Sequence, residues 1–354
     1  NSTTTCIDIG ANNTILDCKG FTINYSTGGI KGYGINATAY TLNLTIKNCN
    51  IVEGNSSTSS KDGMFLNYIK NSTFELNNIT TIGYSSAGID INQPSDYLNF
   101  YNNTISTSNN FANAIELSST NSNVVNNTII TWGEPSFGID RVPSNSNISN
   151  NQFKTYRSAA IGFTPFSESD NNQSIESNTE FGLPIQYNYS ISNSVIENLN
   201  IGQLIIANST NVTIRNITSY HDGIILSYVQ DSEVSDCNMN LNSTGIKIYK
   251  SHYNNITNNN ITVTSNYLFS TVEISSPSNY NLINNNTLTT DDGGIFYISS
   301  NVGLPGFYNN ITNNIINSTG TVNIFDIIYF NNSLIKNNYI EIGGSSSTIF
   351  DLTF

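Results

Sequence analysis

The chain has 354 residues, of which only 10% are charged, and its 25 acidic and 12 basic side chains give a formal net charge of −13 at pH 7. This charge disfavours nucleic acid and anionic membrane surfaces as partners, because both are themselves negatively charged. No apolar run approaches the ~20 residues that a transmembrane helix needs, and residues 1–5 lack the basic and apolar regions of a signal peptide. We therefore expect no insertion into a membrane.

A short motif with two asparagines recurs along the whole chain and predicts a repeat protein. It has the form apolar, any, Asn, Asn, any, apolar, and its clearest copies, at 100–105, 124–129 and 148–153, begin 24 residues apart. The third position of this motif and its close variants is occupied by Asn48, Asn102, Asn126, Asn150, Asn198, Asn258, Asn285, Asn313 and Asn337. Periods of this length are typical of solenoid coils.

The regular asparagine is expected at a corner of each coil, with its side chain inside the solenoid. Successive coils of a parallel solenoid repeat about every 4.8 Å, so equivalent amides can donate and accept hydrogen bonds from coil to coil. Such a ladder would satisfy polar groups that the bend buries. We expect the nine asparagines given above to form it.

A second motif, which begins with Gly-Ile, precedes many of the asparagine corners. Copies begin at Gly34, Gly88, Gly138, Gly223, Gly245 and Gly294. Each coil is predicted to contain a Gly-led strand, a short polar turn, a second strand, the asparagine corner and a third strand, with almost no helix. The fold class predicted is all-β: a single right-handed parallel β-helix of about 13 coils, forming one domain over residues 1–354.

Three carboxylates in the Gly-led strands are the candidate functional residues. The outward position of these strands is occupied, coil by coil, by Asn36, Phe65, Asp90, Glu116, Asp140 and Gly162. Asp90, Glu116 and Asp140 would lie about 5 Å apart as neighbours and about 10 Å apart as next-neighbours, close to the separations in retaining and inverting glycosidases. The same carboxylates could hold Ca²⁺, and no other cofactor is expected. The alternative is an acidic stripe that only keeps the chain soluble.

Arg141 follows Asp140 and interrupts the apolar pattern of an inward column. We expect it to turn outward at a bulge and to form an ion pair with Asp140 or Glu116, rather than to act as a catalytic base. Two further segments, His-Asp-Gly at 221–223 and Asp-Asp-Gly-Gly at 291–294, resemble site motifs. Turns before Gly-led strands favour the same residues, so we interpret both segments as turns.

The cysteines indicate a disulfide rather than a metal site. Four are present, Cys6, Cys18, Cys49 and Cys237, with no CxxC pair. Cys18 and Cys49 occupy the same position in two repeats, so on adjacent coils their Cα atoms would be about 5 Å apart, which suits a disulfide. A bond between Cys6 and Cys18 is the rival pairing. Cys237 is expected to be a buried thiol.

About two dozen Asn-x-Ser/Thr sequons occur in the chain. Those at Asn102, Asn126 and Asn285 arise from the corner motif and are expected to be internal and without glycans. If glycans are attached, we expect them at Asn55, Asn71 and Asn242, which are predicted to lie in turns.

The segment 6–23 and the later Asn-Asn-x-Ile copies resemble right-handed β-helix proteins of the carbohydrate-binding and sugar-hydrolase repeat type. The opening of the chain is similar to that of secreted archaeal cell-surface proteins, and the resemblance implies a secreted or cell-surface location. The Gly-His-Gly and Arg-Ile-Lys motifs of galacturonases and the Asp-Pro-His motif of alginate epimerases are absent. No catalytic residue can therefore be transferred from those families.

Three functions remain open on the sequence. The leading hypothesis is a non-enzymatic extracellular structural protein that self-associates into a filament, sheath or surface layer, because strand edges at the ends of a solenoid can pair with another copy. The first alternative is an enzyme that degrades polysaccharides with Asp90, Glu116 and Asp140. The second is an adhesin that binds glycans through exposed aromatic side chains.

Overall fold

The structure, a computed structural model, describes residues 1–38, 40–142, 144–165, 167–275, 277–299, 308–320, 323–328, 332–343 and 348–353. In these ranges the chain is built of strands and turns, with one 3₁₀-helix, η1 (Glu168–Asn171), and no α-helix. The chain is an all-β, right-handed parallel β-solenoid of about 13 coils. The fold class predicted from the repeats is therefore confirmed.

The chain forms two compact units, unit 1 (Asn1–Gly182) and unit 2 (Leu183–Phe354). The single domain over residues 1–354 stays a prediction. No helix in the described ranges has the length and hydropathy needed to cross a membrane.

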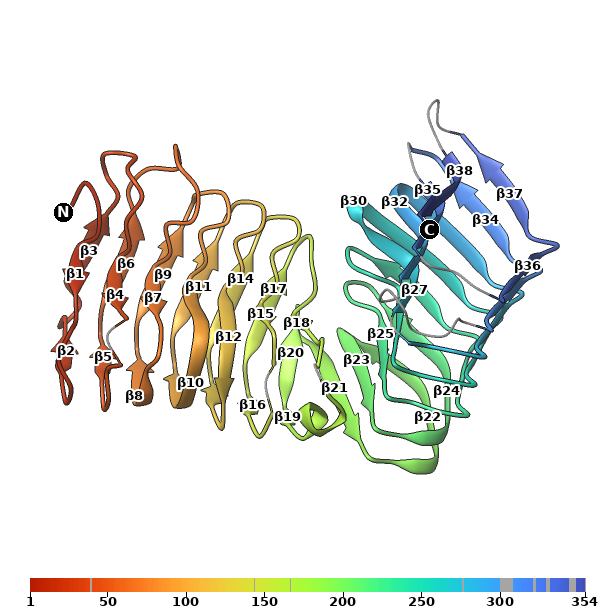
Figure 1. Cartoon of the computed structure of the whole chain (residues 1–354), viewed down its shortest axis with the longest axis horizontal. Helices are drawn as coiled ribbons and strands as arrows, with labels where there is room; N and C mark the ends of the chain where they lie inside the picture. Colours follow the sequence, from red (N-terminus) through yellow and green to blue (C-terminus); the bar gives the residue numbers. More distant parts are fainter. Residues whose placement is uncertain are drawn as a thin grey trace. The chain divides into compact units, whose positions relative to one another are not determined.

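Unit 1 has three columns of parallel strands, which Figure 1 shows stacked coil upon coil. The first column contains β1 (Ile7–Asp8), β4 (Ile35–Ala37), β7 (Met64–Leu66), β10 (Ile89–Tyr101), β12 (Ile115–Thr120), β15 (Ile139–Asp140) and β18 (Ile161–Gly162). The second contains β2 (Ile15–Asp17), β5 (Thr45–Lys47), β8 (Lys70–Glu75), the end of β10, β13 (Asn123–Val125), β16 (Asn147–Ser149) and β19 (Ser174–Glu176). The third contains β3 (Thr22–Tyr25), β6 (Asn50–Glu53), β9 (Asn78–Thr81), β11 (Thr104–Thr107), β14 (Thr128–Thr131), β17 (Gln152–Thr155) and β20 (Asn178–Glu180).

Unit 2 repeats this arrangement, again with parallel pairing throughout its described strands. Its first column contains β21 (Leu183–Tyr189), β23 (Gln203–Ala207), β25 (Ile224–Ser227), β28 (Ile246–Tyr249), the end of β30 (Asn260–Ser275), the end of β32 (Thr287–Ser299), β35 (Asn323–Ile328) and β38 (Thr348–Thr353). The second contains β22 (Ser192–Ile201), β24 (Thr210–Ser219), β26 (Glu233–Ser235), β29 (Asn255–Thr257), β31 (Leu282–Asn284), β33 (Asn310–Thr312) and β36 (Leu334–Lys336). The third contains the ends of β22 and β24, then β27 (Asn238–Leu241), the starts of β30 and β32, β34 (Ile315–Ser318) and β37 (Tyr339–Ile342).

The core follows from the two-residue period of the strands and the coil repeat. Ile89, Ile115, Ile139 and Ile161 pair in register on consecutive coils and are all fully buried. The Gly-led strands begin with glycine because the coils approach closely there. A Cβ atom at Gly88 would lie 2.3 Å from Ile105 Cγ2 and 2.6 Å from the Ala114 carbonyl oxygen, so no larger residue fits.

The buried asparagine ladder lies one residue later than the sequence predicted. The prediction that the nine corner asparagines lie inside the solenoid is therefore wrong, although Asn198, Asn258 and Asn285 do make side-chain hydrogen bonds between coils. Asn102 and Asn126 are exposed, whereas Asn103 and Asn127 are buried. The corner residue adopts the left-handed conformation, with φ of 53° at Asn102, and this bend directs its side chain outward and the next side chain inward. The same positive φ is found at Asn48, Asn102, Asn126, Asn150, Asn198, Asn258, Asn285, Asn313 and Asn337.

The ladder satisfies every polar group of the amides that it buries. In unit 1 it joins Asn77, Asn103, Asn127, Asn151 and Asn178 by side-chain hydrogen bonds of 2.9 to 3.1 Å. Asn127 Nδ2 also donates to the Phe100 carbonyl at 3.0 Å, and Asn127 Oδ1 accepts the backbone N–H of Asn103 at 2.9 Å. Among its described residues, unit 2 has two such ladders, through Asn254, Asn281 and Asn309 and through Asn259, Asn286, Asn314 and Asn338.

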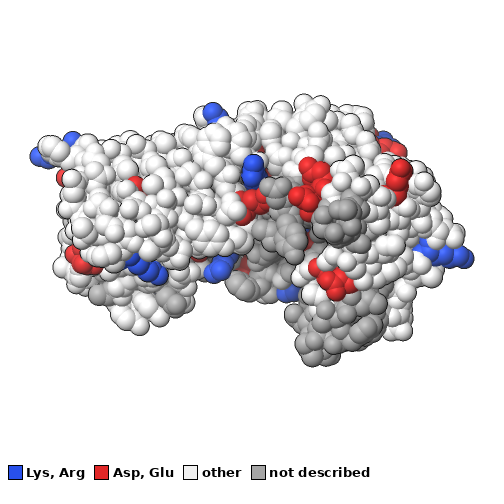
Figure 2. All heavy atoms as spheres, turned by 90° about the horizontal axis from the view of Figure 1, so that it is seen from above, with Lys and Arg blue, Asp and Glu red and all other residues white. Residues whose placement is uncertain are grey.

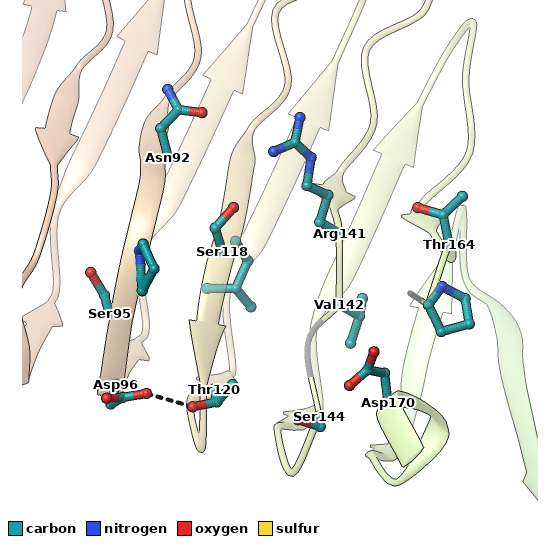
Figure 3. Close-up of a pocket in the computed structure, with 13 residues that line it drawn as sticks. Asn92, Ser95, Asp96, Ser118, Thr120, Arg141, Val142, Ser144, Thr164 and Asp170 are labelled. Carbon is teal, nitrogen blue, oxygen red and sulfur yellow. Dashed lines mark hydrogen bonds between the residues drawn. The ribbon is translucent and has the colours of Figure 1, made fainter. Parts of the chain in front are cut away.

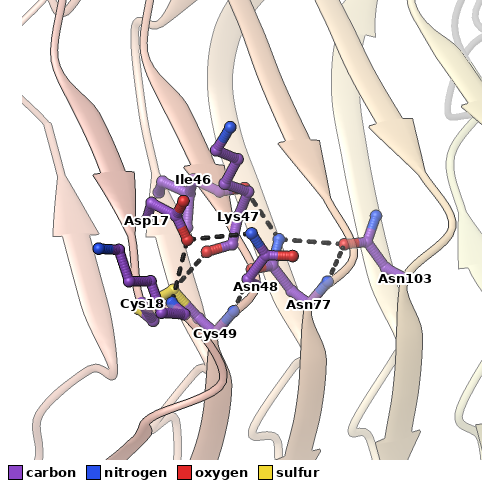
Figure 4. The surroundings of a disulfide bond; sticks show 9 residues. Asp17, Cys18, Ile46, Lys47, Asn48, Cys49, Asn77 and Asn103 are labelled. Carbon is purple, nitrogen blue, oxygen red and sulfur yellow. Dashed lines mark hydrogen bonds between the residues drawn. A yellow bond between two sulfur atoms is a disulfide. The ribbon is translucent and has the colours of Figure 1, made fainter.

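Cysteines replace asparagine in the ladder column at the N-terminal coils of unit 1. Cys18 and Cys49 form a disulfide with their Cα atoms 4.8 Å apart, so of the two pairings left open the structure has this one, and Cys6 is free. Figure 4 shows the disulfide beside the ladder, and the Cys49 N–H donates to Asn77 Oδ1 at 3.0 Å. Cys237 is a buried free thiol whose N–H donates to Asn259 Oδ1.

The ladder gives a stability prediction with a control on the adjacent residue. Asn127→Ala removes one ladder amide and leaves buried partners on Asn103 and Phe100 unpaired, so we expect it to lower the free energy of unfolding by about 3–5 kcal/mol. Asn126→Gly changes an exposed left-handed residue to one that tolerates this conformation and should alter stability by less than about 0.5 kcal/mol. Urea unfolding followed by circular dichroism measures both, and similar effects of the two variants would contradict a ladder at Asn127.

Candidate functional site

The three candidate carboxylates lie in one column on the outer face of unit 1. Asp90 on β10 pairs in register with Glu116 on β12, and Glu116 pairs with Asp140 on β15. Neighbouring strands are about 4.8 Å apart, so the outer two carboxylates are separated by about 10 Å along the column. Phe65 on β7 precedes Asp90 in this column and Gly162 on β18 follows Asp140.

Burial and mutual repulsion raise the pKa of two carboxyls of this column, Asp90 and Glu116. Asp90 is only 7% exposed, and burial, followed by the charge of Glu116, raises its pKa to about 7. The pKa of Glu116 is raised first by burial and then by Asp140. A charge on one of these groups therefore disfavours a charge on the next.

Asp62 is a fourth carboxyl group beside the column that the sequence analysis missed. It is buried, its Oδ1 accepts the Ala87 N–H at 2.8 Å, and burial followed by the charge of Asp90 raises its pKa well above the usual range. Asp62 precedes Gly63 at the start of a Gly-led strand. This acidic residue before a Gly-led strand was the signal that could have identified it.

The hydrogen bonds of the column leave one carboxylate oxygen without a partner. Asn92 Nδ2 donates to Asp90 Oδ2 at 2.6 Å, and Asn113 Nδ2 donates to Glu116 Oε1 at 3.2 Å. In the described part of the chain Asp90 Oδ1 is buried and accepts no hydrogen bond. A ligand donor at this oxygen would satisfy a group that is otherwise costly to bury.

Arg141 turns outward beside the column. Its φ is 58°, its side chain is 47% exposed, and its Nε lies 3.6 Å from Asp140 Oδ2. This matches the outward turn and the ion pair with Asp140 that were expected from the sequence, although the described pairing of β15 has no β-bulge. An exposed pair of this kind contributes little to stability, so Arg141 remains accessible to a ligand.

Aromatic rings border the column at both ends. Tyr33 stacks on Phe65 with ring centroids 4.5 Å apart and an interplanar angle of 9°. A Cβ atom at Gly162 would lie 3.1 Å from the ring of Phe137, so glycine at this position lets that ring pack against the strand. The carboxylates thus lie on a face whose borders are apolar.

A pocket of about 420 Å³ adjoins the column on the same face of unit 1. Figure 3 shows Asn92, Ser118, Arg141 and Thr164 side by side from successive coils. Ser118 lies two residues after Glu116 on β12, so both side chains point outward. The described residues that line the pocket are Asn92, Pro94, Ser95, Asp96, Leu117, Ser118, Thr120, Arg141, Val142, Ser144, Thr164, Pro165 and Asp170.

Charged and hydroxyl groups are held in fixed positions along one wall of this pocket. Thr120 Oγ1 donates to Asp96 Oδ1 at 2.5 Å, and Lys70 Nζ lies 3.0 Å from Asp96 Oδ2. The hydrogen bonds from Thr120 and then Lys70 lower the pKa of Asp96. Asp96 is therefore an ionised acceptor at neutral pH, in contrast to Asp90, whose pKa is about 7.

Other candidates from the sequence do not join this site. In the described ranges no three His, Cys, Asp or Glu side chains are grouped closely enough to hold a metal ion. Asn71 is exposed, whereas Asn55 and Asn242 are half-buried. Figure 2 shows that most side chains on the face it presents are uncharged.

Comparisons with known proteins identify no family: no family model matches the chain, and no curated protein matches it. Among solved structures, the A-module of the Azotobacter vinelandii mannuronan C-5 epimerase AlgE6 is similar at 13% identity and a TM-score of 0.39, over 92% of this chain and 80% of that one. Also similar is the Siphovirus 9NA tailspike receptor binding domain, at 9% identity and a TM-score of 0.25, over 98% of this chain and 74% of that one. PfbA, a surface adhesin of Streptococcus pneumoniae, is similar at 11% identity and a TM-score of 0.25, over 98% of this chain and 86% of that one.

The raised pKa of Asp90 predicts how stability changes with pH. The pKa of this carboxyl is about 7 in the folded chain and has its usual value of 3.8 in the unfolded chain, so the folded chain binds the proton more tightly. The free energy of unfolding therefore falls as pH rises from about 4 to about 7 and then levels off. Asp90→Asn removes this loss, so we expect it to be more stable than the parent at pH 8, by at most about 4 kcal/mol, and similar to it near pH 4.

Asp96→Asn is the control of opposite sign for this experiment. Its carboxyl has a lowered pKa, so its contribution is present at neutral pH and is lost in acid. The variant should be less stable than the parent at pH 8 and converge with it in acid. Urea unfolding at several pH values tests both, and a stability difference for Asp90→Asn that does not change with pH would contradict the proposed titration.

Proposed function

We propose that unit 1 binds a glycan chain across the carboxylate column and the adjoining pocket. The observation that carries this proposal is the pocket of about 420 Å³, whose size lies within the range of ligand sites. It combines hydroxyl, amide, carboxylate and guanidinium groups with the apolar surfaces of Pro94, Val142 and Pro165. Sugars present hydroxyl groups that both donate and accept hydrogen bonds, together with apolar C–H faces, and this lining complements both.

The coil repeat favours a linear polymer over a small molecule. A chain that runs across the strands meets an equivalent outward position about every 4.8 Å, as at Asn92 and Ser118. The acidic column repels polyanions, so the ligand that fits is a neutral or amino-sugar glycan. Asp90 Oδ1, which has no hydrogen-bond partner among the described residues, would pair with a sugar hydroxyl, which can both donate and accept a hydrogen bond.

Filling the pocket tests this proposal. Ser118→Trp places a bulky ring among the lining residues, and we expect it to abolish binding of the neutral oligosaccharide that the parent binds best on an array of glucan, xylan, mannan and chitin fragments. Ser106→Trp on β11 is the matched control, because Ser106 is also half-buried but does not line the pocket. Isothermal titration calorimetry measures both variants, and unchanged binding by Ser118→Trp would exclude the pocket.

Hydrolysis of the bound glycan is the second candidate function, and the raised pKa of Asp90 favours it. A carboxyl with a pKa of about 7 can donate a proton to a leaving group at neutral pH. Asp140, about 10 Å along the column, would act as the base for a water molecule, a separation close to that of inverting glycosidases. Glu116 lies between them and would stabilise the developing positive charge on the sugar.

Release of reducing ends from a polysaccharide that binds tests hydrolysis. We expect Asp90→Asn and Asp140→Asn to lower the rate by about 10²–10⁴-fold, with binding retained, whereas Glu75→Gln on β8, outside the column, should not change it. If the parent protein binds the glycan but releases no reducing ends, hydrolysis is excluded and the binding function stands.

The leading hypothesis from the sequence, a self-associating subunit of an extracellular filament, sheath or surface layer, stays a prediction. The secreted or cell-surface location is likewise part of our proposal. The Cys18–Cys49 disulfide supports that location, because such bonds persist in oxidising compartments.

A further inference from the structure

The Asn-x-Ser/Thr sequons of this chain lie on its outside for a geometric reason. Side chains along a strand alternate between the two faces, so an asparagine and the residue two positions later point the same way. In the buried ladder that later residue belongs to the apolar core, as Ile105 does for Asn103 and Ile129 does for Asn127. The buried ladder asparagines consequently form no sequon, whereas exposed corner asparagines can.

Asn102 and Asn126 are the sequons at which this geometry is clearest. Both asparagines are exposed and left-handed, with φ of 53° and 59°. Within the described residues neither side-chain amide has a hydrogen-bond partner. The hydroxyl residues of these sequons, Thr104 and Thr128, pair in register on β11 and β14, where Thr104 is exposed and Thr128 half-buried. The expectation that these two sequons are internal is therefore wrong.

Other exposed corner asparagines use their amides between coils. Asn216 Nδ2 donates to Asn198 Oδ1 at 2.5 Å, and Asn285 Nδ2 donates to Asn258 Oδ1 at 2.6 Å. An asparagine amide in such a hydrogen bond must break it before the amide nitrogen can react with another molecule. The free amides of Asn102 and Asn126 have no bond of this kind to break.

We propose that Asn102 and Asn126 are acceptor sites for N-linked glycans. The amide nitrogen of each asparagine would attack the anomeric carbon of a sugar held on a lipid pyrophosphate. The new C–N bond forms as the C–O bond to the pyrophosphate breaks, the pyrophosphate leaves with the bonding electrons, and the amide loses one proton to the transferase. The outward Thr two residues later completes the motif that the transferase recognises.

The chain supplies its own negative control in the next coil of the same column. Asn150 is exposed and left-handed, with φ of 56°, but Gln152 stands where Asn102 and Asn126 have threonine. Gln152 pairs in register with Thr128. The corner φ is therefore matched among the three asparagines, and within the three-residue sequon only the third residue differs.

Site-resolved mass spectrometry of the full chain tests the proposal. The chain is secreted from a eukaryotic host and treated in H₂¹⁸O with an N-glycosidase that converts glycosylated Asn to ¹⁸O-labelled Asp. We expect the label at Asn102 and Asn126 and none at Asn150. Gln152→Thr should add a labelled site at Asn150.

Loss-of-site variants complete the test without altering the corner backbone. Thr104→Val and Thr128→Val should each remove the label from one site, and both keep a β-branched residue in the strand, so folding measured by circular dichroism should be unchanged. Unlabelled Asn102 and Asn126 in folded, secreted protein would overturn the proposal. Label at Asn150 in the parent chain would overturn it too, because modification would then not depend on the sequon.

Discussion

The hydrogen-bonded column of buried asparagines is the interaction on which the rest of the structure depends. Each coil must turn a corner with polar backbone groups facing the interior, and an inward amide provides a donor for the coil on one side and an acceptor for the other. Asn127 bonds in this way to both Asn103 and Asn151. Because the bonds run from coil to coil, they also set the register between coils.

This register places residues that are far apart in sequence into columns on the surface. Asp90, Glu116 and Asp140 face the same side because Ile89, Ile115 and Ile139 beside them are all directed into the core. A column of this kind brings like charges within one strand spacing of each other. The resulting repulsion, together with burial, raises the pKa of Asp90 and Glu116.

The outward columns divide into positions that serve the fold and positions that remain available. Asn285 and Asn216 bond to the neighbouring coil. The pocket beside Arg141 and the free amides at Asn102 and Asn126 have no such structural role. Our proposals of glycan binding and of glycan attachment both concern surfaces of this second type.

The sequence by itself determined the all-β solenoid, the strand period and the identity of the carboxylate column, because repeats of 24 residues and alternating apolar positions encode which residues stack. It also identified Cys18 and Cys49 as equivalent positions, although a second pairing stayed open. Only the tertiary structure decided which asparagine of each pair is buried, since a left-handed corner at Asn102 reverses the expected direction of the side chains. The burial of Asp62 and the pocket likewise required three dimensions, because burial and the space between coils depend on neighbours that a linear motif does not specify.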